Sequence, residues 1–205
     1  MKVLQSGFRL PWIGEAAPLT APLPFVPPPR SVERNLVLEE AVDTLLLKEA
    51  IEPVHPLSPG FYGHIFCVPK ASGGWRPVLD LSRLNSFLTP VSFKMETVES
   101  IKDSIQQMDW AASIDLADAY FHILIHPEFR KWARFVWNDQ PFQFKALPFG
   151  LSLAPWIFTR VVRQFLASLR EQGIRIKAFL DDWLILAQSR EACAQHIQVV
   201  LDQAR

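Results

Sequence analysis

The sequence of 205 residues has few cysteines, no excess of either charge, and no long apolar run. Its two cysteines, Cys67 and Cys193, are too far apart to form a C-x-x-C pair. This excludes a zinc site built on such pairs and is typical of a reducing compartment. The 21 basic and 21 acidic residues balance. Net charge therefore neither indicates nor excludes a nucleic-acid partner, because a neutral protein can carry a basic groove.

Apolar stretches are short throughout the chain. None approaches the roughly 18 residues of a membrane span, and the start, MKVLQSGFRLPW, lacks the apolar core of a signal peptide. We therefore expect an intracellular protein, in the cytoplasm or nucleus. Hydrophobic residues make up 49% of the chain and aromatic residues 12%, which is enough for a substantial packed core.

Proline is concentrated at the N-terminus, where residues 1–30 hold seven of the 17 prolines. Repeated proline blocks helices and sheet ladders, so we predict an extended arm. Two interpretations stay open. The arm is either a strap along the domain surface, which we favour, or a motif that binds a partner.

Helical and strand patterns alternate after the arm. Apolar spacing predicts a helix that Ser31 caps and that reaches Ile51, with Pro53 just beyond it. Further elements are a hairpin over 64–85 with a Ser-Gly-Gly turn, a strand running into a helix over 111–127, a hairpin over 132–150 turning at Asn138-Asp139, a helix stopped by Gly173, strands joined at Asp181-Asp182, and a last helix capped by Ser189. This order fits an α+β fold, an antiparallel sheet with helices on one face. We find no internal repeat at a fixed period.

The adjacent aspartates Asp181 and Asp182 interrupt an apolar stretch, AFLDDWLILA. A buried unpaired carboxylate is costly, so a tight hairpin that lifts both to its tip is the simplest explanation. Asp115 ends another apolar strand, and it would converge with Asp181 if the two strands are neighbours. Clustered carboxylates resist ionising together unless a cation balances them. Hard oxygen ligands favour Mg²⁺ or Mn²⁺, and a pair of such ions can promote phosphoryl transfer.

Four segments resemble, in order, the motifs of reverse transcriptases. They are the fingers hairpin VPKASGGWRPVLDLSRLN, the first catalytic motif SIDLADAYFHILIHP, the glycine-containing motif ALPFGLSLAPWIF, and FLDD, which is similar to the Tyr-x-Asp-Asp box with Phe179 in place of tyrosine. The resemblance covers residues 35–200, approximately. The GFRLPW arm, GGWRPVLDLSRLN and LDDWLILA are most similar to retrotransposons of the DIRS group, which encode a tyrosine recombinase.

The resemblance implies the fingers and palm of a right-hand polymerase, with an antiparallel palm sheet and no thumb. We expect an arm over 1–30, fingers over 31–107 and a palm over 108–205 that stops before the primer grip, thumb and ribonuclease H. The implied activity is RNA-directed DNA polymerisation, in which a primer 3′-hydroxyl attacks a dNTP on an RNA or DNA template. The implied cofactors are two Mg²⁺ or Mn²⁺ ions.

The resemblance also assigns the site residues. Asp115, Asp181 and Asp182 are the implied catalytic carboxylates and, with the Leu116 carbonyl, the metal ligands. The implied dNTP-binding residues are Lys70 and Arg76 on the triphosphate, the backbone around Asp118 and Ala119, Tyr120 under the sugar as a barrier to a 2′-hydroxyl, and Phe149 and Gly150 beside the templating pair.

Several residues keep a structural alternative. Asp118 is more readily a helix cap than a ligand, Asp115 alone could cap a strand end, and the Asp pair alone could be a solvated turn. Tyr120 could be a core residue, and His122 and His126, at helical spacing, are expected to be ordinary surface histidines. Ala71 and Ser82 depart from the family, since many relatives carry a basic residue at each position.

Two other functions compete with the polymerase. A truncated, non-catalytic remnant could still bind nucleic acid or protein, and the shortened chain and Ala71 favour it. A metal-dependent nuclease or transposase would also need three carboxylates, but it would need neither the fingers hairpin nor a residue like Tyr120. A polymerase lengthens a primer, a nuclease shortens it, and a remnant does neither.

Overall fold

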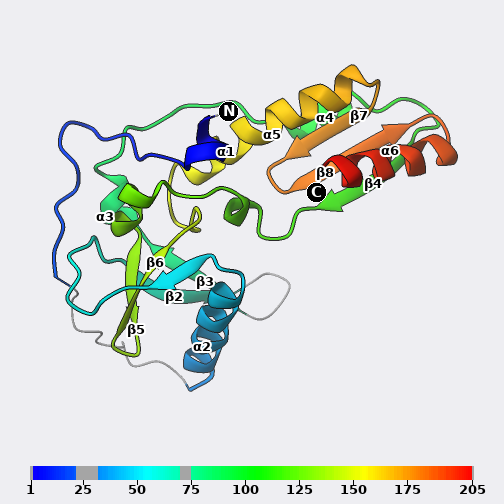
Figure 1. Ribbon diagram of the computed structural model, residues 1–205. Helices are drawn as coiled ribbons and strands as arrows, with labels where there is room; N and C mark the ends of the chain where they lie inside the picture. The colour runs from blue at the N-terminus through cyan, green and yellow to red at the C-terminus, as the bar shows by residue number, and fades with distance from the viewer. Residues whose placement is uncertain (1, 22–31, 70–74, 205) are drawn as a thin grey trace. The chain divides into compact units, whose positions relative to one another are not determined.

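The computed structural model describes residues 2–21, 32–69 and 75–204 (Figure 1). The chain forms two compact units, which we describe separately. The first unit comprises Met1–Pro90 and Tyr120–Ala154, and the second comprises Val91–Ala119 and Pro155–Arg205. These units are defined by packing, and the partition into arm, fingers and palm remains a prediction. No helix in the described part of the chain is both long and apolar enough to cross a membrane.

The first unit combines two small antiparallel sheets with short helices. Its elements are α1 Lys2–Ser6, α2 Val32–Leu47, β1 Ile51–Pro53, β2 His64–Pro69, β3 Trp75–Asp80, α3 Ser82–Asn85, the 3₁₀ helices η1 Ala119–His122 (which begins at the unit boundary) and η2 Pro127–Trp132, β5 Arg134–Trp137 and β6 Gln140–Phe144. One sheet has the strand order β1-β6-β5 and the other is the β2-β3 hairpin. The core is apolar, with Leu38, Leu81, Leu84, Ile123, Ile125, Phe135 and Leu147 fully buried.

Both predicted hairpins of this unit are present. β5 and β6 turn at Asn138 and Asp139, whose φ angles of 46° and 61° are those of a type I′ turn, as predicted. β2 and β3 pair from His64 with Asp80 to Pro69 with Trp75. The predicted Ser-Gly-Gly turn between them lies outside the described residues.

The arm runs along the first unit as the strap interpretation expects. Phe8 forms a bridge with Ile125, and further bridges join Trp12 to Leu88 and Thr20 to Gly60. Phe8, together with Leu10 and Ala17, is buried. The helix α1 was not predicted, and it lies before Pro11, the first proline of the chain. Residues 22–30 of the arm are outside the described part.

The helix predicted to reach Ile51 ends earlier. α2 stops at Leu47, and Ile51 begins strand β1, so the predicted helix end was wrong. Glu49 takes a left-handed φ of 52°, and the Ala50 amide donates to the Leu45 carbonyl at 2.9 Å. This closing bond terminates the helix without a glycine or proline, which is why the pattern of apolar residues missed it. The predicted cap, Ser31, is outside the described residues.

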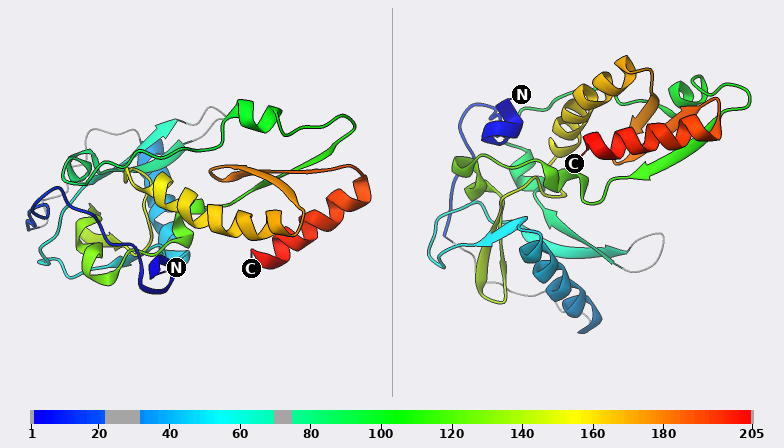
Figure 2. Two further views of the ribbon diagram at one scale, coloured as in Figure 1. Left: turned by 90° about the horizontal axis from the view of Figure 1, so that it is seen from above. Right: turned by 45° about the vertical axis from the view of Figure 1, so that its right-hand side comes forward.

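The second unit contains a three-stranded antiparallel sheet with the order β4-β8-β7. Its two long helices, α5 and α6, lie on one side of this sheet (Figure 2, left). Its elements are α4 Val98–Lys102, β4 Trp110–Asp115, α5 Ala154–Glu171, β7 Arg175–Phe179, β8 Asp182–Ala187 and α6 Arg190–Gln203. Phe165 of α5 packs on Trp183 of β8 with ring centroids 5.5 Å apart. The predicted α+β fold is confirmed.

The ends of both long helices follow the sequence signals. Ser189 caps α6, because its hydroxyl accepts a hydrogen bond from the Ala192 amide at 3.1 Å. Gly173 ends α5 with a φ of 83°, and the Ile174 amide donates to the Leu169 carbonyl at 3.1 Å. These bonds satisfy backbone groups that a helix end leaves free.

The prediction of an α-helix after Asp115 was wrong. A single 3₁₀ turn, η1, follows, because Asp118 has a φ of 55° and breaks the path from the strand. His122 ends η1, whereas His126 caps η2 by accepting from the Glu128 amide. The two histidines therefore do not share one helix face.

Candidate active site

The two adjacent aspartates lie where β7 turns into β8. Leu180 and Asp181 form the turn, and Leu180 has a φ of 54°, which is unusual for a residue with a branched side chain. The indole nitrogen of Trp183 donates to the Leu180 carbonyl at 3.2 Å, and the Leu116 amide donates to the Asp181 carbonyl at 3.0 Å. These bonds hold the turn in a conformation that its own sequence does not favour.

Asp115 ends β4 directly opposite Asp182 on β8. The bond from the Leu116 amide to the Asp181 carbonyl is the pattern that flanks a non-hydrogen-bonded pair. In such a pair the Cα atoms are about 4.5 Å apart and the side chains share a face. The predicted strand neighbours are confirmed. The residue opposite Asp115, however, is Asp182, whereas Asp181 occupies the turn.

The three carboxylates are exposed and do not form a closed ligand cluster. In the described residues, no three His, Cys, Asp or Glu side chains are grouped so that they could hold a metal ion. The donor set is nevertheless all oxygen, which suits a hard cation such as Mg²⁺. Asp115 and Asp182 share one face of the sheet, and Asp181 adjoins them on the turn. The chemical type of these ligands therefore suits a divalent ion, although the three side chains do not close around one point.

The backbone that follows Asp115 forms a short 3₁₀ helix and not the longer helix that the sequence predicts. Asp118 directly precedes η1, and Ala119, its first residue, is buried. The amides predicted to hold a triphosphate therefore belong to one 3₁₀ turn.

In the first unit, Tyr120 packs against Phe149, with ring centroids 5.0 Å apart and planes at 53°. Gly150 has a φ of 105°, and a Cβ added there would lie 2.0 Å from the Leu79 carbonyl oxygen. Glycine is thus required by the protein's own backbone, a reason that the sequence alone did not give. The Gly150 carbonyl accepts from the Asn85 side chain at 2.8 Å, a brace that sequence reasoning missed.

One of the two predicted triphosphate contacts lies on the β2-β3 hairpin. Arg76 occupies β3 opposite Val68 in register, whereas Lys70 and the departure at Ala71 are outside the described residues. The guanidinium of Arg34 lies 4.7 Å from the ring centre of Trp75, so α2 supports the strand that carries Arg76.

The departure at Ser82 has a structural role. Its amide donates to the Asp80 carboxylate at 2.9 Å and starts α3. Hydrogen bonds from Ser82 lower the pKa of Asp80.

An ion pair fastens the far end of the β7-β8 hairpin. Arg175 donates two hydrogen bonds to Asp109, at 2.7 and 2.8 Å, and Gln188 donates a third at 2.6 Å. The hydrogen bonds from Arg175, the largest cause, lower the pKa of Asp109 to about 2. The side chain of Asp109 is only 3% exposed. Sequence reasoning missed this pair, because Asp109 and Arg175 are far apart in the chain.

Comparison with known proteins places these motifs in one family. Residues 68–205 match the family "Reverse transcriptase (RNA-dependent DNA polymerase)". The chain is 26% identical over 183 residues to the Pol polyprotein of equine infectious anemia virus (strain Wyoming), covering 85% of this chain and 16% of that protein. It is 30% identical over 181 residues to the Gag-Pro-Pol polyprotein of squirrel monkey retrovirus, covering 82% of this chain and 9% of that protein.

A transposon protein and a solved structure are also similar. The Transposon Tf2-3 polyprotein of Schizosaccharomyces pombe is 26% identical over 141 residues, which are 69% of this chain and 10% of that protein. The structure of the foamy viral protease-reverse transcriptase in complex with double-stranded DNA has a TM-score of 0.76 at 19% identity, covering 94% of this chain and 32% of that chain. The chain thus spans a small part of each relative.

Proposed function

Because this chain belongs to the reverse transcriptase (RNA-dependent DNA polymerase) family, we propose that it is the polymerase domain of a retroelement. In this proposal it joins a dNTP to the 3′-hydroxyl of a primer paired with an RNA or DNA template. The curated relatives include retroviral and transposon polyproteins. Within that range we assign the chain to the DIRS group, on the GFRLPW, GGWRPVLDLSRLN and LDDWLILA segments.

The placement of Asp115 opposite Asp182, with Asp181 on the adjoining turn, is the observation that carries the proposal. We assign these carboxylates and the Leu116 carbonyl as ligands of two Mg²⁺ or Mn²⁺ ions. When bound, the ions would activate the primer 3′-oxygen for attack and stabilise the negative charge on the leaving pyrophosphate. The protein's own contribution is to hold the carboxylate oxygens together at one exposed end of the sheet.

We assign the nucleotide-binding roles from the resemblance to the family. Arg76 and Lys70 would hold the triphosphate, since a guanidinium suits phosphate oxygens, and the amides around Asp118 and Ala119 would add donors. Tyr120 would exclude a ribose 2′-hydroxyl, and its packing on Phe149 supports a ring held in place. Phe149 and Gly150 would lie beside the templating pair.

We propose the nucleic-acid partner from the structural similarity to the foamy viral enzyme. The foamy viral relative was solved with double-stranded DNA. A template–primer duplex is therefore the substrate that we propose for this chain, with the incoming dNTP as the second substrate.

Primer extension tests the proposal. Purified chain is given an RNA template, a labelled DNA primer, dNTPs and Mg²⁺ or Mn²⁺. We expect extension by the wild type and a loss of at least about a hundredfold in Asp181→Asn, because removing a charge-stabilising group at the reacting centre costs that much or more. Asp139→Asn is the matched control, since Asp139 is on a hairpin turn where asparagine is equally suitable.

The other outcomes identify the alternatives. A primer that is shortened in an Asp181-dependent way would contradict the polymerase and support a nuclease. A folded wild type that binds the duplex but leaves the primer unchanged would contradict polymerase activity in this chain and support a non-catalytic remnant.

A further inference from the structure

The strand β7 is an edge strand of the second unit's sheet, and it leads directly into the turn that carries Asp181. An edge strand normally presents unpaired amide and carbonyl groups. In β7, two side chains form hydrogen bonds with such backbone groups. Glu96 accepts a hydrogen bond from the Ala178 amide at 2.8 Å, and Arg170 donates to the Ile176 carbonyl at 3.0 and 2.8 Å.

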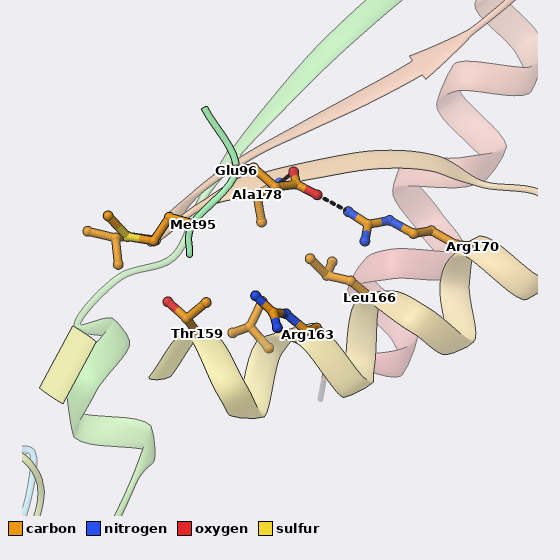
Figure 3. Close-up of a pocket in the computed structure, with 9 residues that line it drawn as sticks. Met95, Glu96, Thr159, Arg163, Leu166, Arg170 and Ala178 are labelled. Atoms are coloured by element: carbon orange, nitrogen blue, oxygen red, sulfur yellow. Dashed lines mark hydrogen bonds and ion pairs between the residues drawn. The ribbon is translucent and has the colours of Figure 1, made fainter. Parts of the chain in front are cut away.

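These two side chains also bind each other. The Arg170 guanidinium lies 2.6 Å from the Glu96 carboxylate. Figure 3 marks this ion pair with a dashed line. A half-exposed ion pair alone contributes little to stability. In this case, however, each charged group also makes a charge-assisted bond to the backbone of β7, which is stronger than a neutral one. The pair therefore ties α5 and the segment before α4 to the same stretch of strand.

Packing beside the hairpin is incomplete at this point. A small cavity of about 50 Å³ lies there, lined among others by Met95, Thr159, Leu166 and Leu180. The Thr159 hydroxyl is buried and has no hydrogen-bond partner among the described residues. Because a cavity offers few van der Waals contacts on its side of the strand, the hydrogen bonds from Glu96 and Arg170 help to determine where this edge lies. Leu180, in its left-handed conformation, borders the same cavity.

We propose that Glu96 and Arg170 are positioning residues that fix the free edge of β7 and thereby aim the Asp181-Asp182 turn. Ala178 immediately precedes Phe179, which lies opposite Asp182 in register. A shift of the β7 edge would therefore move Phe179 and, with it, the carboxylate of Asp182. The inference rests on the proposed polymerase function, in which a displacement of about 1 Å costs about a hundredfold in rate.

Substitutions at Glu96 separate a positioning role from a simple surface charge. Glu96→Gln keeps an acceptor for the Ala178 amide, whereas Glu96→Ala removes it. Glu99→Ala removes an exposed carboxylate of the neighbouring helix and is the matched control. The double variant Glu96→Arg/Arg170→Glu restores opposite charges, but it places a donor against the Ala178 amide and an acceptor against the Ile176 carbonyl.

Two readouts are combined: amide hydrogen exchange resolved at Ala178, and single-turnover primer extension. We expect Ala178 exchange to rise about tenfold or more in Glu96→Ala and in the double variant, because a hydrogen bond to a charged group is lost. We expect Glu96→Gln to have an intermediate effect, because it keeps an acceptor for the Ala178 amide but loses the charge, and Glu99→Ala to stay within about twofold of the wild type. Extension by Glu96→Ala should slow by about tenfold to a hundredfold, with the dNTP KM changed less than about threefold.

Two results would overturn the inference. The first is unchanged Ala178 exchange in Glu96→Ala, or equal effects of Glu96→Ala and Glu96→Gln. The second is altered exchange with unaltered extension, which would make the pair a structural contact only. If the wild type extends no primer at all, the proposed function fails instead, and Ala178 exchange still reports whether Glu96 caps the strand.

Discussion

Gly150 is the residue whose identity the structure explains most directly. Its φ of 105° and the Leu79 carbonyl oxygen 2.0 Å from an added Cβ leave no room for a side chain. The resemblance places this glycine beside the templating pair. The close neighbour is instead the backbone of β3, so Gly150 is needed for folding whether or not it also contacts a substrate.

Replacing this glycine should therefore destabilise the protein. We expect Gly150→Ala to lower the free energy of unfolding by about 2 to 4 kcal/mol, the sum of a left-handed alanine and a displaced backbone. Urea unfolding followed by circular dichroism measures it. Gly14→Ala is the matched control, because Gly14 has a φ of 77° but nothing within 4 Å of an added Cβ, and it should cost only about 1 to 2 kcal/mol. Equal losses in the two variants would contradict the steric explanation.

At the scale of elements, the β7-β8 hairpin is the part on which the candidate chemistry depends. Glu96 and Arg170 occupy its free edge, the Leu116 amide holds its turn, and Asp109 binds Arg175 at its base. Each of these contacts joins residues distant in sequence. The position of the hairpin therefore depends on contacts with other parts of the second unit.

The Asp109–Arg175 pair should make stability depend on pH in acid. The pKa of Asp109 falls from its ordinary 3.8 to about 2 on folding, so the pair stabilises the protein fully above pH 3.8 and loses this effect as pH falls through 2. We expect Asp109→Asn to be less stable than the wild type at pH 6 and the difference to shrink in acid. Urea unfolding across this range tests it, with Asp103→Asn as an exposed control from the same unit. A difference that is constant with pH would contradict the linkage.

At the scale of the whole molecule, the residues assigned to the reaction are divided between two units. Asp115, Asp181 and Asp182 belong to the second unit, whereas Tyr120, Phe149 and Gly150 belong to the first. The relatives that share this family are long polyproteins, of which the chain spans 9 to 16% in the retroviral examples.

The open arrangement of the carboxylates predicts weak metal binding by the chain alone. A ligand that binds only the folded state raises its melting temperature in a concentration-dependent way. We expect millimolar Mn²⁺ to raise the Tm of the wild type and to have a smaller effect on Asp115→Asn, measured by differential scanning fluorimetry. Mn²⁺-free buffer of matched ionic strength is the control. An equal shift in both proteins would contradict a role for Asp115 in binding the ion.

Local sequence determined much of this protein. The turn at Asn138-Asp139, the cap at Ser189, the stop at Gly173 and the strands on either side of the Asp pair were all predicted, because each depends on residues only a few positions apart. The family and its ordered motifs were likewise visible in the sequence.

The tertiary structure decided what depends on residues far apart. It ended α2 at Leu47 through a left-handed Glu49, and it reduced the helix after Asp115 to one 3₁₀ turn. It also placed Asp182 rather than Asp181 opposite Asp115, a matter of strand register. Glu96 and Arg170 carried no signal of their own in the sequence, because their role arises only when α5 and the segment before α4 meet the free edge of β7.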